Sequence, residues 1–206
     1  MVRYNPRAEK NFKRIGRTRE VKQSFLIVCE GVNTEPEYFK AFRLTSASVK
    51  AIGEGLGTTR LVEEAIIVKE LETRKHHVYD QYWVVFDKDQ SSDETFSKAI
   101  KLAEKNGFKV AYSNQAFEYW FLLHFNLYQG KIHRERYEEM LSKASGIAYS
   151  KKEGFITKFF QLLESYQLKA IERASKILAE FHGLQPAKAE SSTTVHELVN
   201  ELNKFR

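Results

Sequence analysis

Short apolar runs alternate with helical patterns along the chain as far as about residue 128, and this alternation restricts the fold more than any other feature. Residues 24–29, 82–86 and 108–112 are rich in β-branched and aromatic side chains, which is typical of strands buried on both faces. Residues 48–52 are expected to form a further short strand. Helices are predicted between and after these strands, at about 34–42, 58–76, 92–105 and 115–126. The pattern predicts an α/β fold with a parallel sheet covered by helices on both faces.

The pattern changes after Gly130, where no convincing strand follows. Helical spacing there predicts four helices, at 137–144, 154–165, 168–181 and 193–205. We therefore expect a basic N-terminal arm (residues 1–22), an α/β core (23–128) and a helical C-terminal extension or cap (129–206). The sequence leaves open whether the helical part is a separate domain.

Charge favours a nucleic-acid partner. The chain of 206 residues has a formal net charge of +6, and basic residues crowd its first segment, among them Arg14 and Arg17. Such an arm could bind phosphates, although a solvated tail explains the same charges. The one cysteine, Cys29, fits a reducing cytoplasm. No apolar run approaches the ~20 residues of a membrane span, and Met1 to Arg19 lack the apolar region of a secretory signal.

Acidic residues follow two of the predicted strands. Glu30 comes directly after the first strand, and Asp87 and Asp89 come after the strand at 82–86. Ligands of parallel α/β sheets bind outside the carboxyl ends of the strands, so these three carboxylates are expected to share one edge. Oxygen ligands of this kind suit Mg²⁺ or Mn²⁺. The sequence therefore predicts a divalent-metal site formed by Glu30, Asp87 and Asp89.

The spacing of the two aspartates supports this interpretation, because residues two apart in extended backbone point to the same side. The alternative is a charged pair that ends a strand in a polar turn. Glu118 lies within an apolar stretch, and a buried carboxylate there requires metal or a salt bridge. Glu118 and Asn114 could therefore face the acidic site, with Asn114 as a contact to nucleic acid. Alternatively, a salt bridge from Glu118 to an arginine or lysine could tether the C-terminal helices. Glu35 is a possible alternative ligand.

Four stretches of the chain together resemble the RloB-like family, whose core is similar to the Toprim domain. These stretches cover residues 25–39, 85–89, 113–125 and 192–199. In the Toprim pattern a glutamate after the first strand acts as general acid or base, and an Asp-x-Asp pair holds Mg²⁺. Glu30, Asp87 and Asp89 occupy those positions. The Toprim pattern often has a further acidic residue at the position that Ser91 occupies in this chain. The serine argues against a site for a second metal ion unless Glu118 supplies the missing carboxylate.

The resemblance implies a Mg²⁺-dependent endonuclease of bacterial restriction or abortive-infection loci, acting in phage defence beside an ATPase partner. Catalysis would then rest on Glu30, Asp87, Asp89 and Glu118. Thr194 and His196 of the closing stretch could contact substrate phosphate, or Thr194 could cap a helix. Lys88 could contact phosphate or merely offset the aspartates beside it. The alternative function is a nucleic-acid-binding or regulatory subunit with little catalysis of its own. The resemblance does not choose between DNA and RNA.

Overall fold

The computed structural model describes residues 23–89 and 91–206, and helices and strands alternate through its first half. The elements up to the sheet's last strand are β1 (Gln23–Cys29), α1 (Thr34–Lys40), β2 (Ala47–Gly53), α2 (Thr58–Arg74), β3 (Gln81–Asp87), α3 (Asp93–Lys105) and β4 (Lys109–Ser113). The remaining elements are α4 (Glu118–Phe125), η1 (Arg134–Arg136), α5 (Tyr137–Ser145), α6 (Phe155–Glu164), α7 (Gln167–Glu180), η2 (Pro186–Lys188) and α8 (Val195–Asn203). The predicted α/β class is confirmed.

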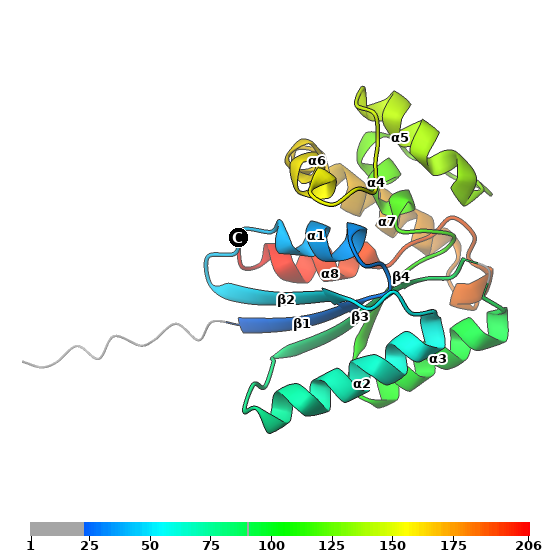
Figure 1. Cartoon of the computed structure of the whole chain (residues 1–206). Coiled ribbons are helices and arrows are strands. Elements are labelled where there is room, and N and C mark those ends of the chain that lie inside the picture. Colours follow the sequence, from blue (N-terminus) through cyan, green and yellow to red (C-terminus); the bar gives the residue numbers. More distant parts are fainter. Residues whose placement is uncertain (1–22, 90) are drawn as a thin grey trace, which may run out of the picture.

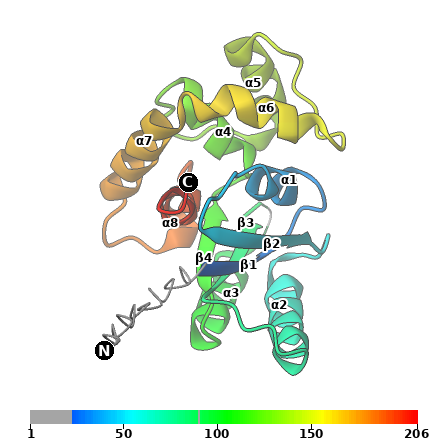
Figure 2. The same cartoon turned by 90° about the vertical axis from the view of Figure 1, so that its left-hand side faces the viewer.

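The four strands form one parallel sheet in the order β2-β1-β3-β4. Helices α2 and α3 cover one face of the sheet, and α1 and α8 cover the other (Figures 1 and 2). The first two strands along the chain are neighbours, and β3 then pairs on the far side of β1. As a result β1 and β3 lie side by side in the middle, with their carboxyl ends at the same edge.

The strands are buried on both faces, as their continuous apolar sequences require. Leu26 and Val28 of β1 pack in a cluster with residues of α2 and α3. Phe25 and Ile27, the alternate residues, pack in the cluster on the opposite face. This division follows the two-residue period of a strand.

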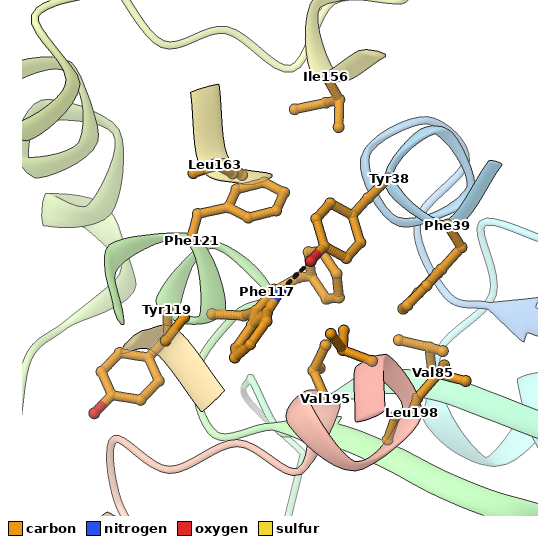
Figure 3. Packing of buried hydrophobic residues seen from close by; sticks show 14 of the residues in the cluster. Tyr38, Phe39, Val85, Phe117, Tyr119, Phe121, Ile156, Leu163, Val195 and Leu198 are labelled. Carbon is orange, nitrogen blue, oxygen red and sulfur yellow. Dashed lines mark hydrogen bonds between the residues drawn. The ribbon is translucent and has the colours of Figure 1, made fainter. Parts of the chain in front are cut away.

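The cluster on the second face is continuous with the helical part of the chain. It joins strand residues to side chains of α1, α4, α6, α7 and α8. Tyr38 of α1 lies near its centre, where its hydroxyl accepts a hydrogen bond of 2.9 Å from the indole N–H of Trp120 (Figure 3). The rings of Phe117 and Phe160 pack edge-on against Tyr38. The sheet and the predicted helical extension therefore share one core.

The closing stretch of the sequence completes the sheet at β4. Thr193 forms an antiparallel bridge with Ser113. The hydroxyl of Thr194 accepts a hydrogen bond of 2.9 Å from the backbone N–H of Tyr112, and its own N–H donates to the Tyr112 carbonyl. Helix α8 then lies on the sheet beside α1 (Figure 1). The last predicted helix is thus part of the cover of the sheet.

Within the described residues, no helix has the length and apolar character that crossing a membrane would need.

Candidate active site

A cavity of about 290 Å³ opens at the edge where β1 and β3 end. Its lining gathers five carboxylates from separate parts of the chain. These are Glu30, Glu35, Asp87, Asp89 and Glu118, and we call them the acidic cluster. The parallel pairing of β1 with β3 explains why residues so far apart in sequence meet here. All four of the predicted catalytic residues therefore line one cavity.

Glu30 is held at the end of β1 by the neighbouring strand. Its backbone N–H donates to the carbonyl of Val85, and its Oε2 accepts a hydrogen bond of 3.0 Å from the N–H of Asp87. Burial raises the pKa of Glu30 to about 7, and the negative charges of Asp89 and Glu35 add to this rise. A carboxyl group with a pKa near 7 is suited to give or take a proton near neutral pH.

Asp87 and Glu35 also carry the marks of crowded negative charge. Burial raises the pKa of Asp87 well above its ordinary value, and Glu35, Glu118 and Glu30 raise it further. Burial raises the pKa of Glu35 to about 7, with a contribution from Glu118. Glu35 faces the loop after β1, where its Oε1 accepts a hydrogen bond of 3.2 Å from Gly31. Protons or a cation would relieve the repulsion among these groups.

Asp89 reaches the cavity by a route that differs from the predicted one. Strand β3 ends at Asp87, and Asp89 has a left-handed backbone with φ of +36°. Its carboxylate accepts hydrogen bonds of 3.1 and 3.2 Å from the N–H and hydroxyl of Ser91. The expectation of two aspartates on one side of an extended strand is therefore wrong. A turn closed by Ser91 brings Asp89 to the same cavity instead.

Glu118, the first residue of α4, has both of the surroundings considered from the sequence. It lines the cavity and is only 4% exposed. Its Oε1 also lies 2.8 Å from Nζ of Lys151 and accepts a hydrogen bond of 3.0 Å from the hydroxyl of Tyr149. Glu118 is thus a member of the acidic cluster and, at the same time, fastens the segment between α5 and α6.

The donor set fits a hydrated divalent cation better than a cage of protein ligands. Across residues 23–89 and 91–206, no three His, Cys, Asp or Glu side chains are arranged to hold a metal ion together. The predicted direct ligation by Glu30, Asp87 and Asp89 at once is therefore not preformed. Mg²⁺ usually keeps several waters and takes one or two carboxylates, and the raised pKa values of Glu30 and Asp87 reflect burial and nearby negative charges, whose repulsion a cation would relieve.

Of the residues predicted to bind nucleic acid, the four that the structure describes do not line the cavity. Lys88 forms an ion pair of 3.0 Å with Asp93. Asn114 is buried and donates its side-chain N–H to the carbonyl of Ala189. Thr194 and His196 are buried as well, and His196 Nδ1 lies 3.1 Å from the carbonyl of Thr193. These contacts give Asn114, Thr194 and His196 a structural task, so their binding to nucleic acid stays a prediction. Arg14 and Arg17 lie outside the described residues.

Two cations at the cavity were missed by sequence reasoning. Arg134 of η1 lies 3.7 Å from the carboxylate of Asp89, and Lys151 pairs with Glu118. Both side chains line the cavity. They belong to polar segments without a motif. They were identified only from the folded structure, in which the helical part lies against the carboxyl ends of the strands.

Comparison with known proteins gives one match. The family model described as RloB-like protein matches residues 25–202. No curated protein and no solved structure matches the chain. The matched residues span the sheet except for the first two residues of β1, and they include the acidic cluster and the helical part as far as α8. The chain therefore belongs to the RloB-like protein family.

Proposed function

We propose that this chain is a divalent-metal-dependent nuclease that hydrolyses phosphodiester bonds of DNA or RNA. The observation that carries the proposal is the acidic cluster, in which carboxylates from β1, β3 and α4 meet in one cavity. Such a concentration of negative charge is costly in a folded protein, and a metal-assisted reaction on phosphate gives it a purpose.

The residues take distinct roles in this proposal. Asp87 and Asp89 would hold Mg²⁺ or Mn²⁺, which when bound supplies Lewis-acid stabilisation of the reacting phosphate. Glu30 would transfer a proton, because its pKa of about 7 allows both protonation states near neutral pH. Glu118 would support the site through its position at the start of α4, where Lys151 and Tyr149 fix its orientation.

The wider setting belongs to the same proposal. The Toprim-like character of the core, a role in anti-phage defence and an ATPase partner are what the RloB-like resemblance implies. The cavity supports the nuclease part of this picture through its carboxylates, whereas the defence role and the partner rest on the resemblance alone.

The decisive experiment measures cleavage by the purified chain. Single-stranded and duplex DNA, RNA and tRNA would be incubated with Mg²⁺ or Mn²⁺ or with a chelator, with and without an ATPase partner of the kind that the resemblance implies. We expect metal-dependent cleavage that Asp87→Ala abolishes and that Glu30→Gln lowers by about 10²–10⁴-fold, the usual contribution of a general acid or base.

Glu104→Gln is the matched control, because it removes an exposed carboxylate of α3 that does not line the cavity. This variant should cleave like the wild type. Binding without cleavage under every condition would contradict the nuclease and favour the alternative function, a nucleic-acid-binding or regulatory subunit.

A further inference from the structure

A second cavity adjoins the acidic one and shares part of its wall. This flanking cavity has a volume of about 470 Å³ and is lined by Gln115, His133, Glu135 and Glu138 in addition to the shared residues. The shared residues are Asp89, Arg134 and Lys151. The volume lies in the range of ~300–1,000 Å³ that small ligands occupy. Arg134 and Lys151 therefore lie at the border between the acidic cavity and a second cavity that is large enough for a small ligand.

Both cations come from the helical part of the chain. Arg134 belongs to η1, and Lys151 lies in the segment between α5 and α6. Gly154 at the end of that segment donates a hydrogen bond of 2.6 Å to Glu37 of α1, and Tyr149 donates to Glu118. The segment is therefore fastened at both sides of Lys151. Its position over the sheet edge is a fixed part of the fold.

Both cations can take a further anion. Arg134 lies 3.7 Å from Asp89, and the two side chains are 37% and 34% exposed. Such an exposed pair contributes about 0–1 kcal/mol, so an exchange of this carboxylate for another anion costs little. Lys151 is 45% exposed and lies 2.8 Å from buried Glu118 and 3.8 Å from Glu138. Its ammonium group has three N–H donors, so it can keep the contact with Glu118 and still donate to a phosphate. The guanidinium and ammonium groups both form charge-assisted hydrogen bonds with phosphate oxygens.

We propose that Arg134 and Lys151 bind a backbone phosphate of the nucleic-acid substrate, so that the strand passes from the acidic cavity into the flanking cavity. This inference rests on the proposed function and assigns it two substrate-binding residues. The neighbouring nucleoside would occupy the flanking cavity, where Gln115 and His133 offer polar contacts. The helical part would then complete the site rather than only cover the core.

Binding rather than cleavage tests this proposal. The probes are fluorescein-labelled single strands of RNA and DNA with the same sequence, followed by fluorescence anisotropy in Ca²⁺ across a series of salt concentrations. Arg134→Gln and Lys151→Gln should each weaken binding roughly tenfold, as expected for a hydrogen bond to a charged group. The slope of log affinity against log salt should become shallower by about 0.7 for each lost phosphate contact.

Lys143→Gln is the matched control, because it removes the same charge from an exposed position of α5 outside both cavities. It should leave affinity and salt slope near the wild-type values. Lys151→Arg keeps the charge and should retain binding. If Lys151→Gln fails to fold, Arg134→Gln still decides the matter, because its partner Asp89 is partly exposed.

The outcomes separate this inference from the proposed function. If both glutamine variants bind with the wild-type affinity and salt slope, or if the wild type binds neither probe, the inference is overturned. If the predicted binding losses appear in a protein that never cleaves, the phosphate site is supported and the nuclease is not.

Discussion

At the scale of single residues, the acidic cluster combines a cost in stability with a chemical capacity. Glu30 and Glu35 have pKa values of about 7 because the folded protein buries them among other carboxylates. Their ordinary pKa is 4.5, which is the value expected in the unfolded chain. The folded state therefore favours their protonated forms, and ionisation works against folding.

This difference predicts how stability depends on pH. A carboxyl group with a raised pKa contributes its full stability below pH 4.5, and that contribution is lost as the pH rises through about 7. Burial lowers the pKa values of His124 and His196, so these two residues contribute in the opposite direction over part of this window, and only a comparison with Glu30→Gln, which cannot ionise, isolates Glu30. Without divalent cations, the thermal midpoint of the wild type should fall by several degrees relative to that of Glu30→Gln across this window. Added Mg²⁺ should raise the wild-type midpoint most at the alkaline end.

Differential scanning calorimetry at a series of pH values measures these midpoints. Glu63→Gln is a suitable control, because Glu63 is an exposed residue of α2 away from the cavity. A wild-type midpoint that does not fall relative to that of Glu30→Gln between pH 4.5 and about 7 would show that the folded protein does not disfavour the ionised form of Glu30.

The sequence predicted the acidic members of the site but not its basic ones, for a physical reason. Glu30 and Asp87 end parallel strands, so the sheet alone fixes their common edge. Asp89 lines the same cavity, but a turn and not an extended strand places it there. Arg134 and Lys151 depend on how the helical part folds back, and no local pattern encodes that path.

At the scale of elements, the loop after β1 packs closely against the end of β2. It carries Gly31 and Val32 directly after Glu30 and passes against the end of β2. A Cβ atom at Gly53 would lie 2.2 Å from the carbonyl oxygen of Gly31 and 2.7 Å from Cα of Val32. Glycine is therefore needed at Gly53 because two backbones approach closely there.

Gly53→Ala should displace this loop and, with it, Glu30. Overpacking of this kind costs about 1–3 kcal/mol, and each kcal/mol lowers the thermal midpoint of a chain of this size by about 2–4 °C. We expect a lower midpoint together with reduced metal-dependent cleavage.

Thermal denaturation and the cleavage assay together check this result. Gly57→Ser is the control, because a Cβ atom at Gly57 meets nothing within 4 Å and serine is favourable at a helix N-cap. An unchanged midpoint in Gly53→Ala would mean that the loop can move away from β2 at little cost.

Local pattern was sufficient for most of these elements. The predicted strands and the main helices are confirmed with small shifts at their ends, such as β3 at Gln81–Asp87 against the expected 82–86. The periodicity of the sequence did not predict which element each helix packs against. Helices α6 and α8 have similar amphipathic patterns, yet α8 packs on β4 of the sheet whereas α6 packs on α1 (Figure 1).

At the scale of the whole molecule, the last helix, α8, packs against the sheet near the first strand. Val195, Leu198, Val199 and Leu202 of α8 are fully buried in the cluster that also contains Phe25 of β1. Thr193 and Thr194 satisfy the backbone of β4 at the same place. The sheet therefore depends on residues from the far end of the helical part. The residues before and after position 128 share one hydrophobic core.

Removal of residues 193–206 should abolish cooperative folding. Each fully buried aliphatic side chain contributes about 1.5–3 kcal/mol, so the four on α8 together rival the ~5–15 kcal/mol that stabilises a typical domain. The backbone N–H of Tyr112 would also lose its partner on Thr194.

Near-ultraviolet circular dichroism should show loss of fixed aromatic packing, and thermal denaturation should lose its sharp transition. Asn200→Ala, on the exposed side of α8, should change neither measurement. A truncated chain that still melts sharply at the wild-type midpoint would mean that α8 only rests on a sheet already complete, and the acidic cluster would then need no support from the end of the chain.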